Sequence, residues 1–332
     1  SIIVTKILGY IFFSFKIDPD HSHKVIGVLM RPIDYFFKSV KKSPDSIFLI
    51  DDNERYSYRE AEEKIITIAR SLHKSGLRIG DSVAVYSPNT SDAVICLFAA
   101  ICAGGAWVPI NIRNSTTTNA EYMAYVRTKC LFFHSSLVED ILRIESTIPG
   151  LTQLVCIDKP TERYLSVDEF CDLNKGEILP DWSDPAGVPG HIFSRWPTGG
   201  TTGPSKGVEM TNGNIVTMFE LGVKHYVEGH EEGIVHLAVA PITHAAGLMI
   251  GIFSCVVGTT VVRQTFDPID VLNCIEKFKV THIFLPPTAY YALLEKAKVS
   301  SFDLSSLRQI LIAAAPVSPA KLQEGVEVFG PV

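Results

Sequence analysis

Apolar positions recur along this chain in two alternating patterns, which predict helices and buried strands in turn. Residues 58–75 carry apolar side chains at helical spacing up to Gly76, whereas the short apolar run at 82–87 is typical of a strand. Further helices are predicted at 91–103, 118–128, 212–226, 244–257, 267–278, 288–297 and 318–329. Further strands are predicted at 106–110, 130–134, 154–157, 190–196, 235–239, 259–263, 282–285 and 309–313.

The alternation of strands with longer helices predicts the fold class. Such connections form right-handed crossovers between parallel strands, so that helices cover both faces of the sheet. A polar, loop-rich stretch divides the alternation near residues 175–185. The sequence therefore predicts an α/β protein with two parallel-sheet lobes, the first at residues 30–180 and the second at 181–332.

Composition and charge narrow the range of partners. With 46% hydrophobic and 20% charged residues among 332, the chain is typical of a globular protein long enough to bury a large core. A formal net charge of −6 and the lack of a basic run predict no nucleic-acid partner. Any anionic ligand must therefore be held by local donors and not by the overall charge.

The cysteines indicate the redox environment. The seven cysteines are scattered, mostly in apolar contexts, and no pair has the Cys-x-x-Cys spacing. This pattern predicts neither disulfides nor a zinc site and indicates a reducing compartment, so a cytoplasmic protein is expected. Two matches to the glycosylation pattern, at Asn89 and Asn114, are interpreted as chance.

One segment concentrates groups that suit a polyphosphate. Residues 198–208 read Thr-Gly-Gly-Thr-Thr-Gly-Pro-Ser-Lys-Gly-Val, between a predicted strand and a predicted helix. Glycines let backbone N–H groups approach a ligand, hydroxyls donate to anionic oxygens, and the lysine adds a positive charge. The alternative is an ordinary surface loop, since the same residue types are common in turns. The candidate ATP-binding residues are Thr198, Gly199, Gly200, Thr201, Thr202, Gly203, Ser205 and Lys206.

The spacing of this segment excludes the two common phosphate-binding patterns. A Walker A loop needs glycine, four residues and then Gly-Lys-Ser/Thr, whereas Lys206 is preceded by Ser205 and followed by Gly207. The dinucleotide pattern Gly-x-Gly-x-x-Gly fails because Thr198 stands where its first glycine belongs. The segment is therefore a phosphate-type loop of another kind.

The loop closely resembles the signature of the acyl- and aryl-adenylate-forming enzymes, which include acyl-CoA synthetases, luciferases and the adenylation domains of peptide synthetases. In that family the loop reads Thr-Ser-Gly-Thr-Thr-Gly-x-Pro-Lys-Gly-Val, so this chain departs from it at Gly199 and Ser205. The resemblance implies a large domain of two α/β lobes with ligands between them. It also implies that the loop holds the phosphates of ATP.

Two further stretches resemble family elements that lie beside the acid. Residues 241–247 resemble Pro-x-x-His-x-x-Gly, which implies a catalytic role for His244 next to the carboxylate and places Gly247 in the substrate pocket. Without the resemblance, His244 is equally consistent with a structural histidine, and the other nine histidines are assigned no role. Residues 312–319 resemble the Gly-Gly-Ala-Pro stretch beside the adenine and the acyl group, although an apolar strand end is the alternative. The pocket residues that this implies are Ala313, Ala314, Ala315 and Pro316.

The two ends of the chain differ from a typical family member. Residues 1–29 are expected to be an atypical extension, and its apolar part is too short to span a bilayer, so membrane contact is expected only through residues 1–17. The chain stops at Val332, just before the family's Gln-x-Tyr-Gly-x-Thr-Glu. The resemblance implies that the groups for Mg²⁺ and ribose, and a small C-terminal domain with a catalytic lysine, lie outside this sequence. We therefore expect no metal ligand within this chain and no activity from it alone.

The implied activity is the ATP-dependent conversion of a carboxylic acid, with a fatty or other hydrophobic acid expected, to an acyl-adenylate and then a thioester. The expected partners are the acid, ATP with Mg²⁺, and coenzyme A, and the oligomeric state is left open. One alternative is an adenylation domain that loads a carrier protein. Another is a non-catalytic nucleotide-binding relic, which the departures at Gly199, Ser205 and Asn212 suggest because the family usually has serine, proline and histidine there.

Overall fold

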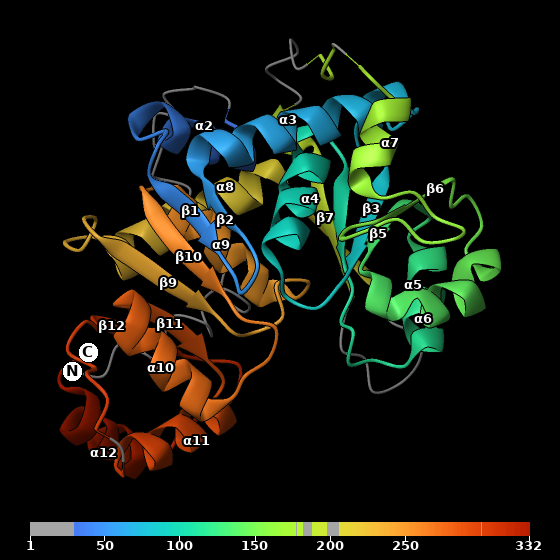
Figure 1. The fold of residues 1–332 in the computed structure, drawn as a ribbon. Helices are drawn as coiled ribbons and strands as arrows, with labels where there is room; N and C mark the ends of the chain where they lie inside the picture. Colours follow the sequence, from blue (N-terminus) through green and yellow to red (C-terminus); the bar gives the residue numbers. More distant parts are fainter. Residues whose placement is uncertain (1–29, 177, 182–187, 198–205, 300) are drawn as a thin grey trace, which may run out of the picture.

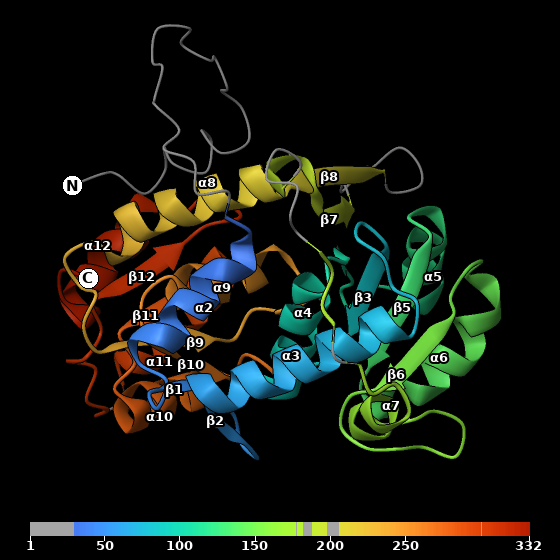
Figure 2. The ribbon, with the colours of Figure 1, turned by 90° about the horizontal axis from the view of Figure 1, so that it is seen from above.

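The computed structural model describes residues 30–176, 178–181, 188–197, 206–299 and 301–332, which form two six-stranded sheets surrounded by helices (Figure 1). In the view from above, the long helix α3 (Tyr58–Lys74) extends from one sheet toward the other (Figure 2). It packs against α2 (Pro32–Lys42), α4 (Ser91–Cys102) and α7 (Val167–Leu173). The predicted α/β class is confirmed.

One sheet has the spatial order β6-β5-β3-β4-β7-β8. Its strands are β3 (Ser82–Tyr86), β4 (Ala106–Pro109), β5 (Thr128–Phe133), β6 (Gln153–Cys156), β7 (Ile192–Pro197) and β8 (Gly207–Thr211). Neighbouring strands are parallel except β7 and β8, which form an antiparallel pair at the edge. The helices α4, α5 (Thr116–Tyr125) and α6 (Val138–Ile144) follow β3, β4 and β5 and make the crossovers.

The other sheet has the spatial order β12-β11-β9-β10-β1-β2. Its strands are β1 (Ile47–Ile50), β2 (Arg55–Ser57), β9 (Ile234–Ala238), β10 (Gly258–Val262), β11 (His282–Leu285) and β12 (Gln309–Ile312). Only β1 and β2 are antiparallel among these neighbours. The associated helices are α8 (Asn212–Gly222), α9 (Leu248–Ser254), α10 (Pro268–Phe278), α11 (Pro287–Ala297) and α12 (Pro319–Phe329).

The sheets do not follow the division of the chain at residue 180 that the sequence suggested. The early strands β1 and β2 belong to the sheet of β9 to β12, and the later strands β7 and β8 belong to the sheet of β3 to β6. Each sheet is also mixed and not purely parallel, because each exchanged hairpin adds an antiparallel edge strand. The physical reason is long-range pairing, such as Leu49 of β1 with Thr260 of β10, which local periodicity does not encode.

Local sequence explains why most predicted helices are present and why one differs. The helix expected at 58–75 is α3, and its start is fixed by a capping box in which Ser57 and Glu60 each bond the other's backbone N–H. The helix expected at 244–257 is instead a 3₁₀ turn at Ala245–Gly247 followed by the short α9. The sequence-based prediction lacks the helices α2, α6 and α7 and the three strands β1, β2 and β8.

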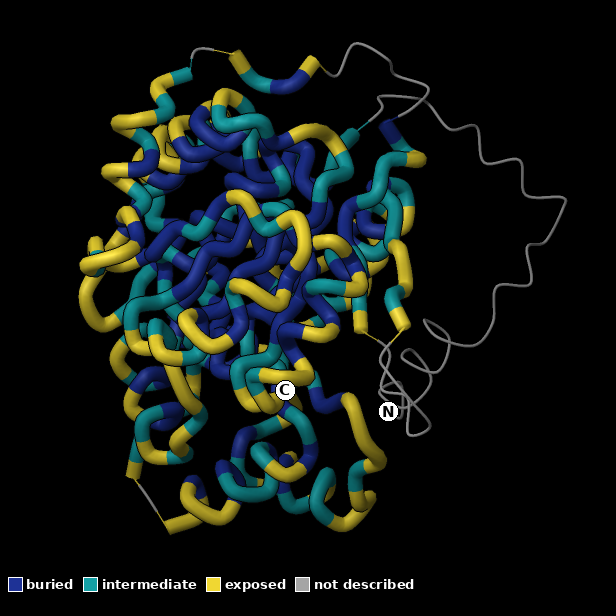
Figure 3. Tube along the Cα trace, turned by 90° about the vertical axis from the view of Figure 1, so that its right-hand side faces the viewer, coloured by how far each residue is buried: buried dark blue, intermediate teal, exposed yellow. Residues whose placement is uncertain are grey.

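Buried residues fill the interior around both sheets (Figure 3). At the junction of α2, β1, α3 and α4, the rings of Phe36, Phe48, Tyr58 and Phe98 pack with centroids 4.8 to 5.7 Å apart. The Ser39 hydroxyl of α2 donates to the backbone oxygen of Ser254 at 2.5 Å, which ties α2 to α9. The same core therefore connects α2, near the start of the described chain, with α9, which lies more than 200 residues later.

Two sequence-based expectations about the chain as a whole can be compared with the structure. All seven cysteines are free thiols, as their scattered spacing predicted. Among the helices of the described ranges, none has the length and apolar character needed to cross a bilayer. The segment 1–17, the one part of the chain for which a membrane contact was considered, lies outside the described residues.

Asn89 joins the two sheets at the ends of their strands. It follows β3, is 3% exposed, and its side-chain amide donates to the backbone oxygens of Ala240 at 2.9 Å and Arg263 at 3.0 Å. Its side-chain oxygen accepts from the N–H of Ile242 at 2.8 Å. Ala240 and Arg263 follow β9 and β10, so this one side chain ties the carboxyl edge of one sheet to that of the other. The buried, bonded amide also supports the interpretation of its glycosylation pattern as a chance match.

We predict that Asn89→Ala lowers the free energy of unfolding by about 3 kcal/mol, because it leaves two backbone oxygens and one N–H buried without partners. Urea unfolding followed by fluorescence measures this change. Asn53→Ala is the matched control, since Asn53 is exposed, and it should change stability by less than about 0.5 kcal/mol. Equal stability of the two variants would show that the Asn89 hydrogen bonds do not hold the sheets together.

Candidate functional site

The predicted phosphate loop follows the carboxyl end of β7 in the sequence. Its residues 198–205, which include all the candidate ATP-binding residues except Lys206, lie outside the described part of the structure. The residues on either side are described: Pro197 ends β7, Gly207 begins β8, and the two pair directly across the hairpin. The candidate Lys206 follows the loop and is exposed. Both ends of the loop are therefore fixed at one edge of the sheet.

The other predicted site residues lie at the carboxyl edge of the second sheet. The turn with His244 follows β9, and Ala313 follows β12, with β11 between these two strands. Because β9, β11 and β12 are parallel, their carboxyl ends meet at the same edge. Asn89 joins this edge to the end of β3 in the first sheet. The fold thus brings the His244 turn and the stretch at Ala313 to the junction between the two sheets. Neither sheet forms this junction alone.

The His244 turn depends on a glycine. The N–H of His244 donates to the oxygen of Pro241 at 3.1 Å, and the N–H of Gly247 donates to the oxygen of His244 at 2.8 Å. A Cβ on Gly247 would lie 1.9 Å from the backbone oxygen of Ile242, so only glycine fits this close approach. Gly247 therefore has a structural role in the turn, whatever it contributes to a pocket.

His244 itself is exposed at one side, while nearby protein atoms remove part of its ring from water. This desolvation lowers the pKa of His244 below its ordinary value. The imidazole is therefore neutral at neutral pH, with one nitrogen to donate and one to accept. Such a group suits a hydrogen bond to a carboxylate or phosphate oxygen more than a permanent ion pair.

The stretch after β12 places a non-glycine residue in a conformation that favours glycine. Ala313 is buried and its N–H donates to the backbone oxygen of Leu285 at 3.3 Å. Ala314 has φ of 76°, in the left-handed region, which costs an L-residue about 1–2 kcal/mol. Ala314, Ala315 and Pro316 are exposed, so this turn presents its backbone at the carboxyl edge.

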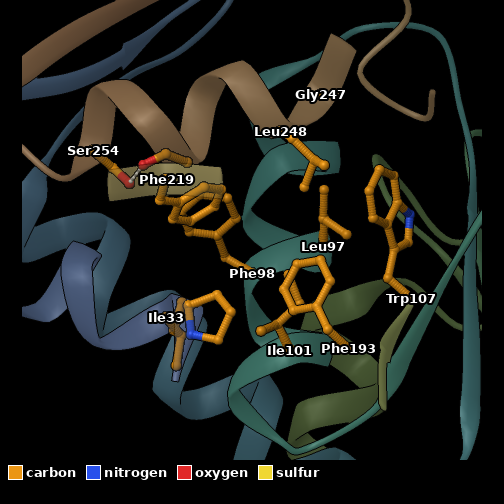
Figure 4. A pocket seen from close by; sticks show the side chains of 12 residues that line it. Ile33, Leu97, Phe98, Ile101, Trp107, Phe193, Phe219, Gly247, Leu248 and Ser254 are labelled. Atoms are coloured by element: carbon orange, nitrogen blue, oxygen red, sulfur yellow. Dashed lines mark hydrogen bonds between the residues drawn. The ribbon is translucent and has the colours of Figure 1, made fainter. Parts of the chain in front are cut away.

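A narrow apolar cavity lies on one side of α9 (Figure 4). It has a volume of about 20 Å³, and Leu97 of α4 faces Leu248 of α9 across it. Trp107 lines one end and is fully buried, with its ring edge-to-face to Trp196 at 5.5 Å. A Cβ on Gly251 would lie 2.2 Å from the Phe219 ring, so α9 and α8 are already in close contact here. The cavity is a packing gap of about one water molecule.

A second cavity on the other face of α9 contains two histidines that the sequence analysis left without a role. His236 of β9 and His282 of β11 pair directly across the sheet, and both are 2% exposed. The ring of Phe253 from α9 stacks on His236 at 4.4 Å and lies 5.1 Å from His282. The sequence offered one signal for them: each histidine lies inside a strand that was predicted to be buried on both faces. The pairing of the two strands was needed to bring them together.

Burial keeps both histidines neutral. It lowers the pKa of His236 to about 3 and the pKa of His282 to about 4. The Nε2 atom of His282 lies 3.1 Å from the backbone oxygen of Tyr226, which only accepts, so Nε2 carries the proton. Its Nδ1 atom then accepts from the Thr281 hydroxyl at 2.8 Å. The Nδ1 atom of His236 is buried and has no hydrogen-bond partner.

The described residues do not form a metal site. No group of three or more histidine, cysteine, aspartate or glutamate side chains in this part of the chain is placed to hold an ion. Described residues therefore do not fit the expected Mg²⁺, and no chemical step is assigned to that ion here.

Comparison with known proteins identifies the family. The AMP-binding enzyme family matches residues 36–332. A methyl-dioxo-octahydro-indenyl-propanoyl:CoA ligase of Mycobacterium tuberculosis is 29% identical over 295 residues, which cover 87% of this chain and 57% of that protein. The feruloyl-CoA synthase of an Amycolatopsis species is 27% identical over 292 residues, which cover 86% of this chain and 54% of that protein. The chain belongs to the AMP-binding enzyme family, and it spans little more than half the length of these relatives.

Solved structures support the same fold. The anthranilate CoA ligase AuaEII, in complex with anthranoyl-AMP, has a TM-score of 0.82 at 22% identity, covering 92% of this chain and 59% of that one. The amide bond synthetase McbA of Marinactinospora thermotolerans has a TM-score of 0.79, also at 22% identity, covering 91% and 58%. The two-lobed fold that the resemblance implied is confirmed.

We predict that this chain loses stability as the pH falls from 7 to 5. An unfolded histidine takes up a proton near its ordinary pKa of about 6.5, whereas His236 and His282 stay neutral in the folded chain at these pH values. Stability is then complete above about pH 6.5 and falls by roughly 4 kcal/mol for the pair at pH 5. Urea unfolding at both pH values tests this, and His236→Leu should remove about half of the loss. The same change in the exposed His225→Leu should leave the pH dependence intact.

We predict that Ala314→Gly raises the free energy of unfolding by about 0.5–1 kcal/mol, because glycine adopts positive φ without the steric cost of a Cβ. Ala315→Gly is the neighbouring control, since Ala315 has no positive φ, and it should lower stability by about 0.4–1 kcal/mol. Thermal or urea unfolding of both variants measures the difference. If both variants raised the free energy of unfolding, or both lowered it, Ala314 would not be strained in solution.

Proposed function

We propose that the protein to which this chain belongs activates a carboxylic acid with ATP and transfers the acyl group to coenzyme A. The observation that carries the proposal is the sequence of residues 198–208, which begins directly after β7 and runs into β8, in a chain of the AMP-binding enzyme family. The named relatives that act as CoA ligases support the choice of acceptor. ATP, coenzyme A and the acid are the proposed substrates.

The proposed reaction has two steps. A carboxylate oxygen of the acid attacks the α-phosphorus of ATP, the bond to the β-phosphate oxygen breaks, and pyrophosphate leaves with that electron pair. The thiol of coenzyme A then loses its proton and attacks the acyl carbon, and AMP leaves as the thioester forms. Positioning and electrostatic stabilisation supply the catalysis, since the protein forms no covalent bond.

Each proposed site element has a distinct task. The loop hydroxyls, backbone N–H groups and Lys206 bind the β- and γ-phosphates, and each charge-assisted hydrogen bond contributes about 1.5–3 kcal/mol. The neutral His244 donates to a carboxylate or phosphate oxygen beside the reacting acid. The exposed backbone at Ala314 and Ala315 gives a flat adenine or acyl group a surface on which to lie. Asn89 keeps these elements in register across the two sheets.

The test is carboxylate-dependent exchange of pyrophosphate into ATP by the complete gene product, over a broad panel of acids. Lys206→Met should reduce exchange by about a hundredfold, because it removes a cation from the developing phosphate charge. Lys224→Met, at another exposed lysine, should leave exchange within about twofold. The absence of exchange with every acid, despite ATP binding, would overturn the proposal and favour a nucleotide-binding relic. Thioester formation on a carrier phosphopantetheine, but not on free coenzyme A, would indicate a carrier-loading domain.

A further inference from the structure

The histidine cavity lies directly behind the elements that carry the proposed acid contacts. Met249 and Phe253 of its wall belong to α9, which follows the His244 turn. Leu311 of its wall belongs to β12 and lies two residues before Ala313, which directly follows that strand. Two residues of a strand span about 7 Å, so the cavity lies about that far behind the carboxyl edge.

The floor of the cavity is a polar row across three neighbouring strands of the sheet. His236, His282 and Gln309 stand side by side on β9, β11 and β12, since His282 is in register with both of the others. Residues in register on parallel strands face the same side, so the row lies under one helix face. The remaining cavity wall includes Tyr226, Met249, Phe253 and Leu311, and none of the cavity residues carries a formal charge at neutral pH.

One polar atom of this row has no hydrogen-bond partner. His282 is held by Tyr226 and Thr281, whereas the Nδ1 atom of the fully buried His236 has no partner. Buried nitrogens in native proteins almost always have a partner, so a water or a ligand group is expected at this atom. Among the buried side-chain atoms of the described residues that lack a partner, this one belongs to a histidine that lines the cavity. A neutral partner fits best, because no residue that lines the cavity carries a charge that could pair with an ionised group, and Arg308, which acts on His282, lies outside the lining.

The cavity is also small. Its volume is about 10 Å³, which accommodates no more than one small group. The imidazole of His236 is stacked on the Phe253 ring, and both rings line the cavity. An extended alkyl chain would have to displace this stack, whereas the tip of a ring substituent would not.

We propose that His236 and His282 form the inner wall of the acid pocket and select a compact ring acid with a neutral hydrogen-bonding substituent over a long alkyl acid. This inference rests on the proposed function and replaces its broad hydrophobic acid with a narrower class. His236 is a specificity-determining residue: its Nδ1 atom binds the substituent, and His282 fixes the floor beside it. A single trapped water on His236 is the competing explanation.

The experiment compares 4-hydroxycinnamate, cinnamate and decanoate in pyrophosphate exchange with the complete gene product. Wild type should favour 4-hydroxycinnamate over cinnamate by about tenfold in kcat/KM, as expected for one buried hydrogen bond, and should use decanoate least. His236→Leu should abolish the preference between the two ring acids. His236→Asn keeps a polar atom near the Nδ1 position and should retain a preference within about threefold of wild type. His225→Leu controls for the removal of an exposed histidine.

Binding of the same acids without ATP, measured by calorimetry, separates this inference from the proposed function. If no acid supports exchange but 4-hydroxycinnamate binds to wild type and not to His236→Leu, the proposed function fails and the pocket assignment stands. If His236→Leu leaves the ring-acid preference unchanged in both assays, the cavity holds only water and the assignment is wrong. Better use of decanoate than of 4-hydroxycinnamate by wild type would also overturn it. Unfolding curves of each variant exclude loss of the fold as the cause.

Discussion

The hydrogen bonds of Asn89 are the constraint on which the site depends. The predicted phosphate loop follows a strand of one sheet, whereas His244 and Ala314 follow strands of the other. Each sheet has hydrophobic packing of its own, and a shared core with residues of both sheets lies between them. This packing is not directional, whereas the buried Asn89 amide makes three short hydrogen bonds to the opposite edge, so shifting the sheets would leave several polar groups without partners.

The exchange of edge hairpins reinforces this junction. The β1–β2 hairpin begins the chain's first lobe but pairs with β10, and the Tyr58 hydroxyl just after it donates to the oxygen of Gly258 at 2.8 Å. The β7–β8 hairpin crosses in the other direction. Opening one sheet away from the other would therefore strain two chain crossings as well as Asn89. A site divided between two sheets is rigid when the chain is shared between them in this way.

The sequence predicted the local elements well and the long-range pairing poorly. Helix α3 could be located to within one residue because its spacing and its Ser57–Glu60 cap are local signals. The phosphate loop was recognised from eleven adjacent residues. By contrast, the membership of β1 in its sheet depends on Thr260, far along the chain. His236 had no local signal of function, since a lone histidine in a strand is usually structural. Only the register with His282 and Gln309 reveals the polar row.

Two features of the site are unfavourable in the free protein, and both lie on the same side of the sheet junction. Ala314 occupies a glycine conformation, and His236 buries a nitrogen without a partner. Strain of this kind persists where the surrounding structure over-determines it, and here β12, β9 and α9 are each fixed by their neighbours. Features of this kind also occur elsewhere in the described residues, since Arg127 and Lys279 have positive φ and other buried polar atoms lack partners. Ala314 and His236 differ from these in position, because both border the proposed acid pocket, where a bound ligand can offset their cost.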